Sequence, residues 1–179
     1  IPKHVSFKKP FAEFTRPFHY IGLQLCENNA LYYQFFWNCI AHKVQKPRDR
    51  LRIAFAFQGK EQGLGGDVYF DTIGRLLGEN HYTNTANIND LVGEHSEGFQ
   101  HKLLVVANEC KFNELKGSVD KVKAMITNPT LIVNPKCVRP FRINLFAMVI
   151  FMTNHANAAA FDNDDNERRL IVFCPTSGT

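Results

Sequence analysis

The sequence lacks several features whose absence narrows the class of protein. No apolar run reaches the roughly 18 residues that a membrane-spanning helix needs. The opening segment IPKHVSFKK is not followed by an apolar stretch, so a signal peptide is not predicted. The five cysteines are odd in number and form no C-x-x-C pair. Free thiols in a reducing, intracellular compartment are therefore expected, rather than a disulfide framework.

Metal-ligand spacings and strong charge are also missing. The seven histidines show no H-x-x-x-H spacing, and Cys39 with His42 is a lone C-x-x-H without a second half, so no zinc site is predicted. The net charge of +4 permits a nucleic-acid partner without requiring one. An initiator methionine is absent too, so we expect the chain to be a piece of a longer protein.

The chain does contain a regular succession of apolar strands and helices. Residues 1–28 are expected to be irregular because Pro2, Pro10 and Pro17 interrupt any long helix. Residues 29–179 are expected to form a single domain. Within it the sequence predicts helices over 29–45, 68–78 and 117–127, buried strands over 52–58, 102–109, 145–154 and 169–174, and a hairpin over 130–143.

The strands are continuously apolar rather than alternating, which is typical of strands buried on both faces. Their alternation with helices predicts an α/β fold, a parallel sheet covered by helices on both faces. In such sheets the ligand site lies at the carboxyl ends of the strands. Polar residues follow three of the predicted strands at that end.

A glycine loop follows the first predicted strand and precedes a predicted helix. Gly59, Gly63 and Gly65 permit the tight turn by which backbone N–H groups surround a phosphate at a helix N-terminus. The loop is one residue longer than the usual phosphate loop. Its lysine position holds Gly66 and its Mg²⁺-binding hydroxyl position holds Asp67, while Lys60 lies earlier in the loop.

Acidic, amide and basic side chains stand near the other strands. Glu109 ends the second strand and can orient an attacking water or hold Mg²⁺ through water, or it is an ordinary surface acid. Asn154 ends the third strand and can place the same water or cap a turn. Arg168 and Arg169 can stabilise charge on a neighbour's phosphates, or pair with the acidic loop before them.

Taken together, these segments resemble the superfamily 3 helicases of viruses and phages, a branch of the AAA+ ATPases, and above all the helicase half of phage and poxvirus-type primase–helicase proteins. The resemblance spans about residues 31–175. The segments that carry it, in order, are WNCIAHKVQKP, FQGKEQGLGGD, KLLVVANE, KVKAMIT, IVNPK, FMTNH and the arginine pair with RRL.

The resemblance implies an AAA+/P-loop-type sheet with a short hairpin before the sensor strand, and it implies roles for single residues. Gly63, Gly65 and the helix from Asp67 resemble the phosphate cradle for ATP. Asn108 and Glu109 match the Walker B end that holds Mg²⁺, and Asn154 matches the sensor. Arg168 and Arg169 match the arginine-finger pair. Lys136 matches the hairpin lysine that contacts single-stranded DNA. Hexameric rings and a host cytoplasm or nucleus are implied as well.

The departures at Gly66 and Asp67 leave two hypotheses. The first is an ATP-dependent DNA helicase or translocase module. The second is a catalytically inactive, helicase-like binding or assembly module. Loss of the lysine removes the cation that neutralises the β- and γ-phosphates, and a carboxylate at position 67 repels them unless a metal intervenes. We therefore expect weak or absent hydrolysis of ATP.

Overall fold

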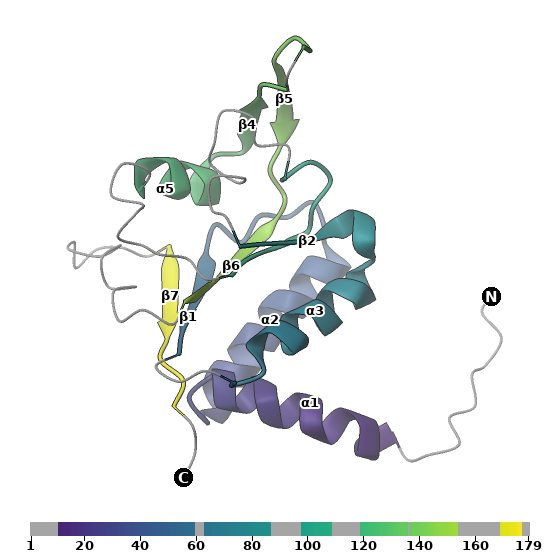
Figure 1. Ribbon diagram of the computed structural model, residues 1–179, viewed down its shortest axis with the longest axis vertical. Helices are drawn as coiled ribbons and strands as arrows, with labels where there is room; N and C mark the ends of the chain where they lie inside the picture. Colours follow the sequence, from purple (N-terminus) through teal and green to yellow (C-terminus); the bar gives the residue numbers. More distant parts are fainter. Residues whose placement is uncertain are drawn as a thin grey trace, which may run out of the picture.

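The computed structural model describes residues 11–59, 63–86, 98–108, 119–135, 137–153 and 169–176. Most of them form a parallel sheet with helices packed against it (Figure 1). The helices are α1 (Phe11–Leu25), α2 (Ala30–Gln45), α3 (Gly66–Leu77) and α5 (Val119–Thr127), with a 3₁₀ turn η1 (Glu79–His81). The strands are β1 (Ala54–Gln58), β2 (Tyr82–Thr85), β3 (Leu104–Ala107), β4 (Thr130–Val133), β5 (Phe141–Asn144), β6 (Met148–Thr153) and β7 (Leu170–Phe173).

The main sheet has five strands in the order β2-β3-β6-β1-β7, and every pairing in it is parallel. A separate antiparallel pair, β4 and β5, forms the hairpin that precedes β6. All parallel strands run in one direction, so their carboxyl ends lie along one edge of the sheet. The predicted parallel α/β sheet and the hairpin before the third predicted strand are therefore confirmed.

Both faces of the sheet are buried against helices. Successive side chains of a strand point to opposite faces, so Ala54 and Ala56 of β1 lie in one core while Phe55 and Phe57 lie in the other. The first core is closed by α5 and the second by α1, α2 and α3, and Figure 1 shows these helices on the two sides of the sheet. Burial on both faces explains why the strands are apolar throughout.

The expectation of irregular structure over residues 1–28 is wrong for α1, which spans Phe11–Leu25 and contains Pro17. A proline inside a helix costs about 3 kcal/mol because it removes one hydrogen bond and crowds the preceding turn. Burial offsets that cost. Leu25 is buried, Ile21 packs against the same core, and the ring of Phe18 stacks on Tyr69 with centroids 4.4 Å apart. Tertiary packing, rather than local propensity, makes this helix.

Local signals predicted the remaining helices well. Asn29 caps α2, and its side-chain oxygen accepts from the N–H groups of Leu31 and Tyr32. Gly78 ends α3 at a φ of 94°, a left-handed conformation that favours glycine. The strand β2 was not predicted, because its sequence YTNT is short and polar. It lies at the edge of the sheet, where β3 supplies its one strand neighbour. The described helices are all too short or too polar to span a bilayer.

Candidate nucleotide site

A cavity of about 440 Å³ opens at the carboxyl edge of the sheet. Four segments that are distant in the sequence converge on it: the end of α1, the glycine loop with the start of α3, the end of β3 and the end of β6. The chain just beyond β7 closes the rim. The lining residues are Leu25, Phe57, Gly59, Gly63, Leu64, Gly65, Gly66, Asp67, Val68, Asn108, Met152, Thr153 and Pro175. The sheet therefore gathers at one place the loop and the two strand ends that the sequence singled out.

The described part of the glycine loop has the backbone that a phosphate cradle needs. Gly63 and Gly65 have φ values of 90° and 75°, in the left-handed region that side-chain-bearing residues rarely adopt. Gly65 is the N-cap of α3, and the helix has no side-chain cap. The unpaired N–H groups of its first turn and its macrodipole face the cavity edge, an arrangement that favours bound anions.

Gly59 fixes the other end of the loop to the sheet. Its N–H donates to the carbonyl oxygen of Thr153 at 3.0 Å, which extends the pairing of β1 with β6 by one residue. Thr153 is buried, with 3% of its surface exposed, and it lines the cavity. The loop thus leaves the sheet beside the end of β6, the strand that the sequence predicts to carry the sensor.

The end of the Met152 side chain lies against position 66. A Cβ atom built on Gly66 collides with the Cε methyl group of Met152 and lies 3.6 Å from Leu25 Cδ2. Gly66 is buried, and both contacting residues line the cavity. The missing lysine is therefore matched by an apolar side chain that fills the space where its stem would begin.

Asn108 supplies an unsatisfied polar atom at the cavity. It follows β3 directly, and its N–H donates to Thr85 at the end of β2, with a distance of 2.8 Å to the carbonyl oxygen. The side-chain Oδ1 of Asn108 is buried and has no hydrogen-bond partner among the described residues. A buried oxygen without a partner costs about 1–3 kcal/mol, so this atom is suited to receive a ligand, a cation or a water.

The charge of the cavity is negative where the described residues line it. Asp67 is exposed in the first turn of α3, and it is the one ionisable residue among the lining residues that the structure describes. A helix N-terminus tolerates that carboxylate well. The donor set, which comprises backbone N–H groups, an amide and a carboxylate, fits a nucleotide triphosphate that arrives with Mg²⁺ better than a bare triphosphate.

Five predicted site residues lie outside the described residues: Lys60, Glu109, Lys136, Asn154 and Arg168. Two of them directly follow residues that line the cavity, since Glu109 follows Asn108 and Asn154 follows Thr153. Their predicted roles remain predictions.

Arg169 lies at the opposite edge of the sheet from the cavity. Its carbonyl oxygen accepts from the N–H of Ala54, the first residue of β1, at 2.7 Å. The four-residue strand β7, about 13 Å long, follows Arg169 and lies between it and Pro175 at the cavity rim. The structure does not bring Arg169 to the cavity of its own chain. Its predicted role is toward a neighbour's phosphates, and the single chain does not test that role.

Sequence reasoning missed two residues that shape the cavity. Met152 looked like an ordinary buried strand residue, and Leu25 fell in a segment predicted to be irregular. No local signal marks either of them, because their importance comes from the packing of β6 and α1 around Gly66.

Comparisons with known proteins identify the family and the fold of the chain. The family model described as "Family of unknown function (DUF5906)" matches residues 57–169, more than half of the chain. The chain is also similar to the "DNA Primase-polymerase" of Nitratiruptor phage NrS-1, with 26% identity over 168 residues that cover 92% of this chain and 23% of that protein. It thus spans about a quarter of the length of this curated relative.

Solved structures with the same fold come from the NrS-1 C-terminal region. One, an apo structure of residues 305–718, superposes with a TM-score of 0.76 at 24% identity and covers 90% of this chain and 38% of that one. A second apo structure, the A form, superposes with a TM-score of 0.75 at 22% identity and covers 90% of this chain and 37% of that one. At these identities the likeness shows the fold.

Proposed function

We propose that this chain, which belongs to the DUF5906 family, is the nucleotide-binding core of an ATP-dependent DNA helicase or translocase module of phage replication type. The geometry of the cavity and the resemblance of the motifs to those of superfamily 3 helicases support this proposal. The cavity takes the triphosphate of ATP. Hydrolysis is slow because position 66 carries no lysine.

The convergence of the glycine loop, Asn108 and Thr153 on one cavity carries this proposal. The glycine loop and the ends of β3 and β6, which the sequence singled out separately, share one hollow of a size that admits a nucleotide. The start of α3 supplies N–H donors there, and the unpartnered Oδ1 of Asn108 supplies an acceptor for a cation. A chance cluster of surface polar residues would not combine positive-φ glycines, a helix start and two strand ends.

The curated relative adds the biological setting. Its name, DNA primase-polymerase, places that phage protein in DNA replication. The matching solved structures belong to its C-terminal region. We propose a replication setting for this chain as well, inside the infected host cell. Single-stranded DNA and further copies of the chain, in a ring, are the partners that the proposal requires.

The remaining roles follow from the resemblance. Glu109 orients the attacking water, Asn154 holds it from the other side, and Arg168 with Arg169 reaches the phosphates of a neighbouring copy. Mg²⁺, when bound, neutralises charge on the phosphate oxygens. Asn108 and Asp67 are the described residues that can hold it.

A catalytically inactive, helicase-like binding or assembly module is the second candidate. One specific observation favours it: position 66 carries no lysine, and the end of the Met152 side chain rests in the space beside Gly66 instead. In that case the fold and the DNA contacts are retained and turnover is absent.

Two matched glycine substitutions test the nucleotide site. Gly65 and Gly78 both have positive φ and lie at the two ends of α3, but only Gly65 lines the cavity. Alanine costs about 1–2 kcal/mol in the left-handed helical conformation of Gly65. At Gly78, where φ is 94° and ψ is 145°, the backbone lies near a region that is almost reserved for glycine, and alanine costs about 1–3 kcal/mol. At Gly65 its Cβ also meets Ile21 Cδ1 at 3.3 Å, whereas nothing lies within 4 Å at Gly78.

The measurement is calorimetric titration of ATP with Mg²⁺ into the full chain and the two variants. We expect Gly65→Ala to weaken binding about tenfold or more, a loss of about 1.4 kcal/mol, and Gly78→Ala to bind as the unaltered chain does. Equal affinity in all three proteins, or no binding by the unaltered chain, contradicts the proposed site. Binding without turnover on single-stranded DNA favours the inactive module.

A further inference from the structure

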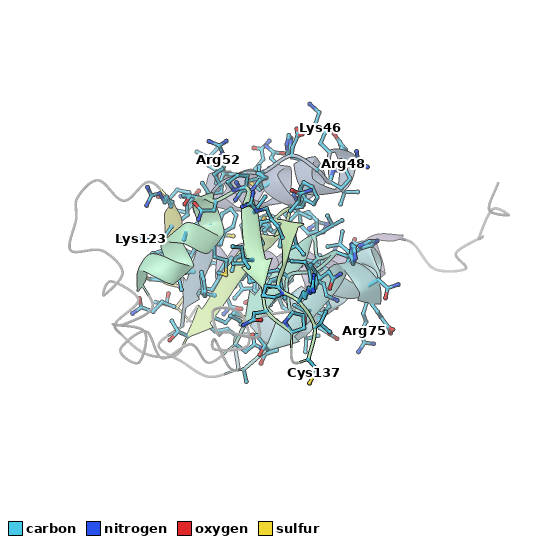
Figure 2. The ribbon with its side chains drawn as sticks, turned by 90° about the horizontal axis from the view of Figure 1, so that it is seen from above. Lys46, Arg48, Arg52, Arg75, Lys123 and Cys137 are labelled. Atoms are coloured by element: carbon cyan, nitrogen blue, oxygen red, sulfur yellow. The ribbon has the colours of Figure 1, made fainter. Side chains whose placement is uncertain are left out.

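A basic surface lies at the edge of the sheet opposite the cavity. The turn after α2 leads into β1 and carries Lys46, Arg48 and Arg52, all exposed. Figure 2 shows the three side chains on one side of the molecule, away from Arg75 on α3. None of the three forms an ion pair or a side-chain hydrogen bond with a residue that the structure describes. Their charges are therefore available to a partner.

The neighbouring charges do not cancel these cations. Asp49 is the one acid between residues 43 and 52, and its carboxylate lies 3.4 Å from Nε2 of His42. Lys43 is buried under the turn, where its Nζ donates to the backbone oxygen of Asp49 at 2.6 Å. An ordinary solvated face mixes both signs, whereas this segment presents unpaired positive charge.

Arg50 holds the segment in place. Its guanidinium donates to the carbonyl oxygens of Thr127 at 2.8 Å and Ile126 at 3.0 Å, at the carboxyl end of α5. On either side of Arg52, Leu51 and Ile53 pack against the core. The cations thus extend from an anchored backbone, which lowers the entropy that a partner must remove on binding.

The backbone at Arg52 is unusual. Its φ is +55°, a left-handed conformation that side-chain-bearing residues seldom adopt. The turn keeps Arg52 exposed between its half-buried neighbours Leu51 and Ile53, two residues before β1 begins.

The shape of this edge favours a nucleic acid over a lipid surface. The β4–β5 hairpin rises from the same edge and projects beyond the rest of the molecule (Figure 1). Its exposed Arg139 and Arg142 continue the positive charge. A flat bilayer would meet the hairpin before it reached the turn at residues 46–52, whereas a strand of nucleic acid can lie beside the hairpin.

We propose that Lys46, Arg48 and Arg52 form a second binding surface, which contacts the phosphate backbone of a nucleic acid without reading its bases. The surface is independent of the nucleotide cavity, and it shares with the proposed function only the kind of partner. Residues 46–52 contain no aromatic side chain for stacking on bases, so binding through this surface is sensitive to salt and indifferent to sequence.

A matched pair of double variants tests this surface. Arg48→Gln with Arg52→Gln removes two charges from it. Arg16→Gln with Arg75→Gln removes two exposed charges elsewhere. Arg16 lies on α1, and Arg75 lies on α3, where it pairs with Asp71. The affinity of the full chain for a labelled oligothymidylate, and for a duplex of equal length, is measured over a range of salt concentrations without nucleotide.

The surface variant is expected to bind both probes about tenfold more weakly, and the slope of log affinity against log salt is expected to fall by about 1 to 2. The control variant is expected to keep the affinity and slope of the unaltered chain. Equal losses in the two variants, or no loss in the surface variant, overturn the proposal. So does weakened binding to phosphatidylserine vesicles with unchanged binding to DNA, which would indicate a membrane partner. If the proposal holds, the surface variant binds ATP as the unaltered chain does. ATP binding therefore tells a failure of the proposed surface apart from a failure of the proposed nucleotide site.

Discussion

The Cε methyl group of Met152 occupies the space that any side chain at Gly66 would need. Gly66 begins α3 at the position where the resembling helicases carry a lysine, and Met152 is the penultimate residue of β6. The contact joins the loop to β6 through an apolar atom. A cation restored at position 66 would have to move this flexible side-chain end aside.

We expect Gly66→Lys with Asp67→Ser to raise ATP hydrolysis only in part, because the new side chain must move the end of Met152 aside. Adding Met152→Ala is expected to raise turnover about tenfold above that of the double variant, because a well-placed cation is a main source of transition-state stabilisation. Hydrolysis is measured with single-stranded DNA, and Met152→Ala alone is the control. If the triple variant stays inactive, the extra residue in the loop between Gly59 and Asp67 is the stronger defect.

Asp67 is expected to weaken nucleotide binding at low Mg²⁺. A carboxylate beside phosphates costs about 1 kcal/mol at the exposed edge of a cavity, so at low Mg²⁺ Asp67→Asn should tighten ATP binding about fivefold. The variant should also reduce the dependence of ATP binding on Mg²⁺, because Asp67 is one of the residues that can hold the ion. The helix loses about 0.3–1 kcal/mol of stability, because an acid at its N-terminus is favourable. The matched control is Asp71→Asn, one turn later, where the carboxylate pairs with Arg75 Nε at 2.9 Å. The measurement is the affinity for ATP over a range of Mg²⁺ concentrations, and we expect the two variants to differ in it. The same Mg²⁺ dependence in both variants would contradict the placement of Asp67 beside the phosphates.

Lys43 should make the stability of the fold depend on pH. Burial lowers the pKa of its ammonium group from 10.5 to about 8, although the carboxylate of Asp49 acts in the opposite direction. Between these two pKa values the unfolded chain binds more protons than the folded chain at this site. The free energy of unfolding contributed by Lys43 therefore rises as the pH increases from about 8 to about 10.5, and it is constant and lowest below that window.

Urea unfolding at pH 7.5 and pH 10 measures this effect. Relative to Lys43→Met, the unaltered chain should gain about 1–3 kcal/mol over that interval. The difference between the two proteins removes the contribution of the other titrating groups. An identical pH dependence in both would mean that the ammonium is hydrated in the folded state.

Lys136, between Pro135 and Cys137 of the hairpin, is predicted to contact single-stranded DNA. Lys136→Ala should weaken binding to an oligothymidylate and lower the salt slope by about 0.7, the value for one phosphate contact on a single strand. Cys137→Ser, a neutral change at the adjacent exposed residue, serves as the control. An unchanged salt titration removes Lys136 from the DNA contacts.

The sequence alone determined the elements whose signals are local. The runs that become β1, β3, β6 and β7 are apolar throughout because both faces of the sheet are covered, and Asn29 and Gly78 mark helix ends through their own backbone and side-chain chemistry. The parallel sheet followed from that pattern, and so did the expectation that a ligand site lies at its carboxyl edge, where the structure has a cavity.

Tertiary structure decided the rest. Helix α1 forms around Pro17 because its apolar face is buried, and the polar β2 becomes a strand because β3 offers it an edge. Strand order brings Asn108 and Thr153 to the glycine loop and sends Arg169 to the far edge. The packing of Met152 over Gly66 has no sequence signal, because it depends on two segments meeting in space that lie more than eighty residues apart in the chain.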